Sequence, residues 1–170
     1  MFDKYGEFNS AEEINKKAEE LNKTATRVEI DILAKENGIE KDDVDDYIKG
    51  YVDSLTNNLM AAVGKLNVEC DEYKIENVLN DWVEELKAEC TESEELAKSV
   101  RKKGKGLDGF IALLADAGFD KKTVVDKKIV SKCKGDIKKI VGSNDFYIGI
   151  PDKATRRALM YQYYTGKKVE

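Results

Sequence analysis

The amino-acid sequence predicts a mainly α-helical fold: a compact multi-helix bundle with helix-turn-helix-like hairpins and at most one short strand segment. Two observations support this prediction. Apolar residues recur at helical spacing through most of the 170 residues, and segments that alternate with the period of a strand are scarce. One proline and 12 glycines argue against a low-complexity chain, and 41% hydrophobic residues are enough for a modest core.

Capping and helix-stopping residues place the elements of the first hundred residues. Ser10 and Glu13 form a capping box before the first helix, and Gly38 ends the second. Thr91 and Glu94 form another capping box in "TESEELAKSV". The predicted helices span residues 9–21, 26–37, 41–54, 55–66, 71–90 and 91–100.

The connector "RKKGKG", residues 101–106, is basic and interrupted by glycines, which favours a boundary. It divides an acidic helical region, residues 1–100, from a basic helical region, residues 101–170, although both could form one continuous domain. Gly118 is expected to end the helix that follows the connector. Further elements are helices at 107–117, 121–134 and 151–164, a short helix or turn at 135–145 and a strand-like segment at 146–150.

Charge is unevenly distributed along the chain. Residues 1–100 hold 26 acidic and 12 basic side chains, a net charge of −14, and residues 101–170 hold 8 and 17, a net charge of +9; together they give −5. Such asymmetry suggests two surfaces for two different partners, or an acidic face beside a nucleic-acid-binding face.

A similar short frame occurs at residues 33–48 and 113–128. Each copy has a small or apolar residue on the first helix, then a glycine and then an apolar residue on the next segment, which is the spacing of a helix-turn-helix. These residues are Ala34, Gly38 and Val44 in the first copy and Leu114, Gly118 and Val124 in the second. A simple αα corner gives the same pattern. After the glycine the first copy is acidic and the second is basic. Because DNA binding requires cations that displace condensed counterions, only the second copy suits a phosphate backbone.

The basic side chains after residue 100 are therefore the predicted nucleic-acid contacts. Tyrosines near the C-terminus could stack bases beside these cations, or could simply pack the last helix onto the core. The predicted contacts are Arg101, Lys102, Lys103, Lys105, Lys121, Lys122, Lys127, Lys128, Lys132, Lys134, Lys138, Lys139, Arg156 and Arg157.

The acidic half offers a candidate partner-binding surface. It is either a solvated face or a surface that imitates phosphates and occupies a basic channel on a partner. The candidate residues are Asp42, Asp43, Asp45, Asp46 and Asp53.

Composition argues against catalysis. Histidine is absent, no two cysteines have CxxC spacing and no nucleophile motif is present, so we expect neither an enzyme, a metal site nor a cofactor. Cys70, Cys90 and Cys133 are expected to be reduced thiols. No secretory signal and no apolar run long enough for a membrane span is found, so the expected location is the cytoplasm.

The opening "MFDKYGEFNSAEEIN" and the ending "IGIPDKATRRALMYQYYTGKK" resemble small proteins of plasmids, conjugative elements and prophages of gut Firmicutes. Within that group the chain resembles the type II-A anti-CRISPR proteins that inhibit Cas9. The resemblance implies an inhibitor that is encoded by a mobile element, acts in the bacterial host cell, binds Cas9 and blocks target cleavage by occlusion. Affinity for DNA is a further expectation. The alternative is a DNA-binding accessory or regulatory protein of a plasmid or phage that uses the basic helix-turn-helix-like segment.

Overall fold

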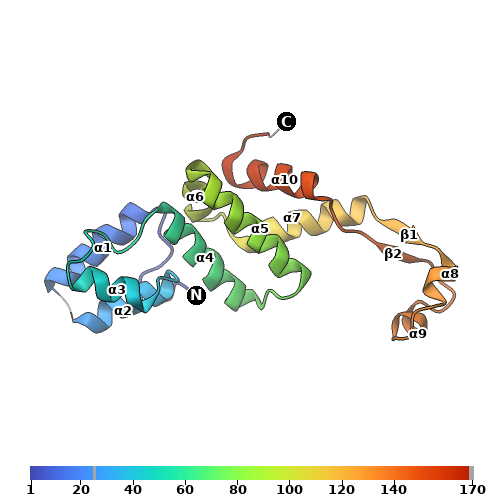
Figure 1. The fold of residues 1–170 in the computed structure, drawn as a ribbon, viewed down its shortest axis with the longest axis horizontal. Helices are drawn as coiled ribbons and strands as arrows, with labels where there is room; N and C mark the ends of the chain where they lie inside the picture. The colour runs from blue at the N-terminus through green and yellow to red at the C-terminus, as the bar shows by residue number, and fades with distance from the viewer. Residues whose placement is uncertain (25, 169–170) are drawn as a thin grey trace.

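The computed structural model describes residues 1–24 and 26–168 and confirms a mainly helical fold. Among these residues lie ten helices and one two-stranded antiparallel sheet (Figure 1). In chain order the elements are α1 (Ala11–Thr24), α2 (Arg27–Glu36), α3 (Lys41–Ile48), α4 (Asn58–Tyr73), α5 (Val78–Glu92), α6 (Glu94–Arg101), α7 (Leu107–Asp120), β1 (Thr123–Val125), α8 (Lys127–Val130), α9 (Ile137–Val141), β2 (Phe146–Ile148) and α10 (Lys153–Thr165).

The core consists of two clusters of buried side chains that meet in α4. The first joins α1, α2 and α3 to the start of α4, and includes Ile14 and Ala61. The second joins the rest of α4 to α5, α6, α7 and α10, and includes Leu66 and Phe110. Val100 lies within the second cluster, so the change in charge near residue 100 does not coincide with a division of the core.

Local capping explains where α1 and α6 begin. Ser10 Oγ accepts a hydrogen bond from the backbone N–H of Glu13 at 3.2 Å, which confirms the first predicted cap. The second predicted cap is wrong by two residues, because Ser93 Oγ, not Thr91, accepts from the N–H of Leu96. The Thr91 hydroxyl instead donates to the carbonyl of Lys87 inside α5.

The single helix predicted over residues 71–90 is two helices. Helix α4 ends at Tyr73, and Lys74 adopts a left-handed conformation with φ of 52°. The N–H of Ile75 then donates to the carbonyl of Cys70 at 3.0 Å, which closes the C-terminus of α4. Trp82, Val83 and Leu86 of the predicted helix therefore lie in α5 and are buried in the second cluster, where α5 packs against α4.

The turn between α2 and α3 depends on two glycines in close contact. Gly38 has a φ of +63°, as expected of a residue that ends a helix, and it lies directly against Gly64 of α4. A Cβ atom on Gly64 would overlap the backbone carbonyl oxygen of Asn37. The close contact between the backbones of Gly38 and Gly64 therefore fixes α2 and α3 against α4.

We expect Gly64→Ala to lower the free energy of unfolding by about 2–3 kcal/mol, because neither backbone can yield without loss of helix contacts. Urea denaturation followed by circular dichroism measures this loss. Gly135→Ala is the control, since a Cβ there meets nothing within 4 Å. Equal unfolding midpoints for the two variants would contradict the predicted contact.

The second copy of the repeated frame is not a helix-turn-helix. Helix α7 continues through Gly118 to Asp120, and the single helix predicted at 121–134 is replaced by β1 and the four-residue helix α8. Thr123, Val124 and Val125 are β-branched and pair in antiparallel register with β2, the strand predicted near Phe146. Gly118 permits close packing instead: a Cβ on it would lie 2.6 Å from the carbonyl oxygen of Gly149.

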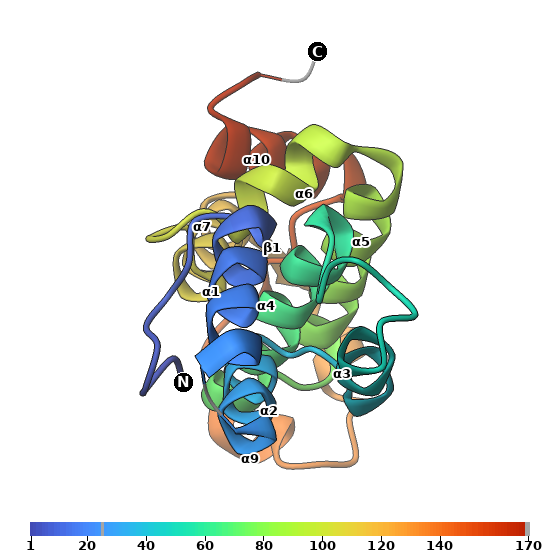
Figure 2. The ribbon, with the colours of Figure 1, turned by 90° about the vertical axis from the view of Figure 1, so that its left-hand side faces the viewer.

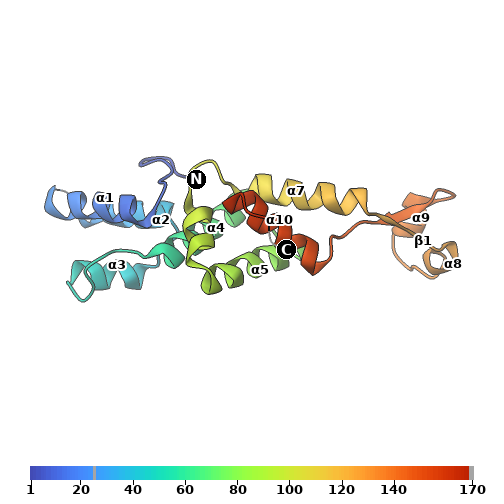
Figure 3. The same cartoon turned by 90° about the horizontal axis from the view of Figure 1, so that it is seen from above.

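Residues 119–150, which we call the arm, project from the helical body. In Figures 1 and 3 the sheet, α8 and α9 lie at one end of the long axis, and α1, α2 and α3 lie at the other. Figure 2 looks along this axis from the α1–α3 end. All residues of the arm are described, and none of their side chains is buried.

The three cysteines are free thiols in the structure. Cys70 and Cys90 are buried in the second cluster, and Cys133 is partly exposed in the arm. Burial raises the pKa of the Cys90 thiol to about 12, so this thiol stays protonated at neutral pH.

Candidate functional site

The arm gathers the largest group of predicted nucleic-acid contacts. It holds eight lysines and four aspartates, a net charge of +4. All eight lysine side chains are exposed. They are Lys121, Lys122, Lys127, Lys128, Lys132, Lys134, Lys138 and Lys139.

Few of these charges are neutralised within the arm. Among the described residues, the ion pairs of the arm are Lys127 with Asp145 at 3.7 Å and Lys139 with Asp136 at 3.3 Å. All four side chains are strongly solvated, and such surface pairs contribute little. The lysines of the arm are therefore available to an anionic ligand.

The prediction that Arg101 contacts nucleic acid is wrong, because its side chain is 1% exposed. Its Nη2 donates to Asn37 Oδ1 at 2.6 Å, and its guanidinium lies 5.7 Å from the centroid of the Phe2 ring. Burial lowers the pKa of Arg101 to about 10, which still leaves it charged at neutral pH. Arg101 thus ties α6 to the turn between α2 and α3.

The connector after α6 is held by the N-terminal segment. The N–H of Lys103 donates to Asn9 Oδ1 at 3.3 Å, and the N–H of Gly104 donates to Glu7 Oε2 at 3.2 Å. Lys105 is partly buried, and its Nζ donates to the carbonyl of Tyr163 at 2.8 Å. Lys102 and Lys103 remain exposed on the body, away from the arm.

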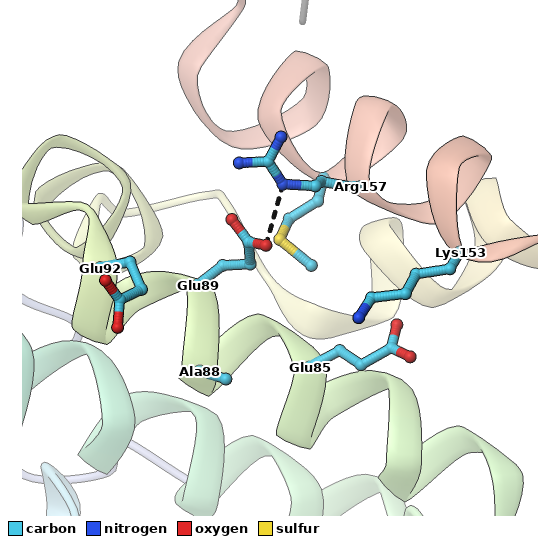
Figure 4. Close-up of a pocket in the computed structure, with 7 residues that line it drawn as sticks. Glu85, Ala88, Glu89, Glu92, Lys153 and Arg157 are labelled. Carbon is cyan, nitrogen blue, oxygen red and sulfur yellow. Dashed lines mark hydrogen bonds and ion pairs between the residues drawn. The ribbon is translucent and has the colours of Figure 1, made fainter.

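Arg156 and Arg157 join α10 to α5. Arg156 binds Glu85 through two hydrogen bonds, Nε to Oε2 at 2.8 Å and Nη2 to Oε1 at 2.6 Å, and Nη1 donates to the carbonyl of Pro151. Arg157 Nε donates to Glu89 Oε1 at 2.9 Å, as Figure 4 shows. These bonds lower the pKa of both carboxyl groups. Both arginines are therefore engaged in holding two helices together.

A hollow of about 190 Å³ lies between these helices. Lys153 and Glu85 extend into it (Figure 4). Of its charged groups, Arg157 pairs with Glu89, and Glu85 pairs with Arg156 beside the hollow. The C-terminal tyrosines pack α10 onto the core, which is one of the two interpretations of the sequence. Tyr164 is buried, the Tyr163 hydroxyl donates to the carbonyl of Gly106, and the Tyr161 hydroxyl donates to the Glu89 carboxylate.

The acidic candidates lie at the end opposite to the arm (Figure 1). Asp42, Asp46 and Asp53 are exposed, and Asp43 is partly exposed. Asp45 forms an ion pair with Arg27, and the hydrogen bond from that guanidinium lowers the pKa of the Asp45 carboxyl. Residues 1–57 hold 15 acidic and 8 basic side chains, a net charge of −7.

Sequence reasoning missed a buried ionic cluster. Lys65 is fully buried in α4, and its Nζ lies 2.6 Å from Glu7 Oε1 and 3.8 Å from Glu69 Oε1. It also donates to the carbonyls of Lys102 and Lys105. A signal was present, because Lys65 and Glu69 are four residues apart in α4, a spacing at which two side chains of a helix can pair.

Sequence reasoning also missed two exposed rings in the arm. Phe119 and Tyr147 both lie close to the Lys122 ammonium and belong to neither core cluster. Aromatic residues that are close in space but 28 positions apart give no local signal.

The fold and site describe a helical protein with a cationic arm at one end and an anionic surface at the other. No family model, curated protein or solved structure matches this chain. Within the described residues, no helix is both long enough and apolar enough to span a membrane.

Proposed function

We propose that this protein is a non-enzymatic inhibitor that binds a nucleic-acid machine of the Cas9 type and blocks cleavage by occlusion. The observation that carries this proposal is the separation of charge onto opposite ends of the molecule. The α1–α3 end has a net charge of −7 and the arm a net charge of +4. One protein can therefore contact a cationic channel and a nucleic acid at the same time.

The acidic end is the contact proposed for the nuclease. Cas9 holds nucleic acid in positively charged channels that recognise backbone geometry and charge. Exposed carboxylates on the short helix α3 present a dense group of negative charges to such a channel. Electrostatic complementarity of this kind raises the association rate and selects the partner.

A second candidate is a DNA-binding accessory protein that works through the arm alone. The observation in its favour is that the eight lysines are exposed and lie on an arm that projects from the helical body (Figure 1). This candidate needs no nuclease and no role for α3. It is no longer a helix-turn-helix mechanism, since α7 continues past Gly118.

A cleavage assay with several Cas9 orthologues tests the first candidate. We expect the wild-type protein to inhibit cleavage, and replacement of Asp42, Asp43, Asp46 and Asp53 by asparagine to raise the half-inhibitory concentration by at least about tenfold. The control changes four exposed acidic residues of the body to their amides: Glu76, Asp81, Glu92 and Asp116.

The control should inhibit as the wild type does, since it makes the same change in net charge at a different place. Lack of inhibition by the wild type at large excess over every orthologue would refute the inhibitor assignment. DNA binding through the arm would then leave the accessory protein as the supported candidate.

A further inference from the structure

One face of the two-stranded sheet is open to solvent. Successive side chains of a strand point to opposite faces, and the register pairs Val124 with Tyr147, so these two side chains share a face. They are 51% and 45% exposed. On the other face, Val125 and Phe146 are only partly exposed, whereas Thr123 and Ile148 are exposed as well.

An ammonium group lies close to two aromatic rings, one of which, Tyr147, belongs to this open face. Lys122 Nζ is 3.4 Å from the centroid of the Phe119 ring and 5.2 Å from that of the Tyr147 ring. Phe119 is 66% exposed although it is a large apolar side chain. The arrangement offers a positive charge for a phosphate and exposed π-faces for a base.

We propose that Phe119, Lys122 and Tyr147 bind single-stranded nucleic acid by stacking its bases. The proposal rests on the nucleic-acid contact that the proposed function assigns to the arm, and it narrows the ligand to an unpaired strand. In a duplex the bases stack on one another and present only their edges and phosphates to a protein. Exposed rings therefore gain stacking contacts only from unpaired bases.

The rest of the arm is consistent with this ligand. Helices α8 and α9 have four and five residues, which is too short for a recognition helix in the major groove. The eight exposed lysines favour a polyanion over an apolar protein surface, because such a surface would desolvate the ammonium groups without pairing them. The same lysines can follow the phosphates of a strand whose bases reach the rings.

Fluorescence anisotropy with a labelled oligothymidine of about 20 nucleotides, and with a duplex of the same length, tests the proposal. We expect the wild type to bind the single strand at least about tenfold more tightly than the duplex at equal salt. Phe119→Ala and Tyr147→Ala should each weaken single-strand binding at least about fivefold and leave duplex binding unchanged. Phe119→Tyr and Tyr147→Phe keep a ring and should bind as the wild type does.

The outcomes separate this proposal from the broader function. Equal affinity for both nucleic acids, or alanine variants that bind the single strand normally, would overturn stacking while the phosphate contact of the arm stands. If the protein binds neither nucleic acid at low salt, both the stacking proposal and the phosphate contact of the arm are overturned. The exposed rings would then be a contact surface for a protein partner. Circular dichroism checks that the alanine variants fold, as expected for side chains outside both core clusters.

Discussion

Replacement of Lys65 by methionine is expected to lower the free energy of unfolding by about 3–5 kcal/mol, because it leaves buried carboxylates without their cation. Glu69 is 2% exposed, and its Oε2 accepts the N–H of Leu107 at 2.8 Å. Urea denaturation measures the loss. Lys98→Met is the matched control, because Lys98 pairs with Glu94 on the surface, where such a pair contributes at most about 1 kcal/mol.

The pH dependence of this loss identifies its cause. Burial raises the pKa of the Glu69 carboxyl, and removal of Lys65 raises it further. A carboxyl whose pKa is higher in the folded state destabilises the fold when ionised, and this effect is relieved as the pH falls through the folded-state pKa. The deficit of Lys65→Met should therefore shrink at lower pH, and adding Glu69→Gln should recover part of it at neutral pH. A deficit independent of both changes would mean that lost packing, not an unpaired charge, is the cause.

The elements that the sequence predicts well are those set by neighbouring residues. The start of α1 depends on Ser10 and Glu13, three positions apart, and the turn after α2 depends on the backbone freedom of Gly38. The strand near Phe146 was also visible in its alternation. Its partner β1 was not, because residues 121–134 show helical spacing and the pairing of Val124 with Tyr147 joins positions 23 apart.

The residues of the candidate site also differ in how well the sequence predicts their surroundings. The lysines of the arm stay exposed because the arm has no core of its own: none of its side chains is buried. Arg101, Arg156 and Arg157 each bind a partner 64 to 71 positions away in the chain. Only Arg157 among them stays exposed. Net charge along a sequence predicts where cations are numerous. It does not predict which of them a distant carboxylate or amide will bind.

Charge reversal in the arm is the change expected to affect nucleic-acid binding most. Replacing Lys121, Lys122, Lys127 and Lys128 by glutamate should weaken binding at least about a hundredfold, because each neutralised phosphate contributes through counterion release. The slope of log affinity against log salt should decrease in magnitude by about 3–4 for duplex DNA. Filter binding or anisotropy between low and physiological salt measures both quantities.

A matched variant separates the arm from net charge. Replacing four exposed lysines of the α1–α3 end by glutamate, Lys16, Lys35, Lys41 and Lys49, takes the net charge from −5 to −13, just as the arm variant does. If only total charge mattered, the two variants would lose affinity equally, since long-range repulsion of the polyanion would be similar. If the lysines of the arm bind phosphates directly, only the arm variant flattens the salt slope. Undiminished binding by the arm variant would place the nucleic-acid contact elsewhere. The exposed candidates that remain are Lys132, Lys134, Lys138 and Lys139 of the arm and Lys102, Lys103 and Arg157 of the body.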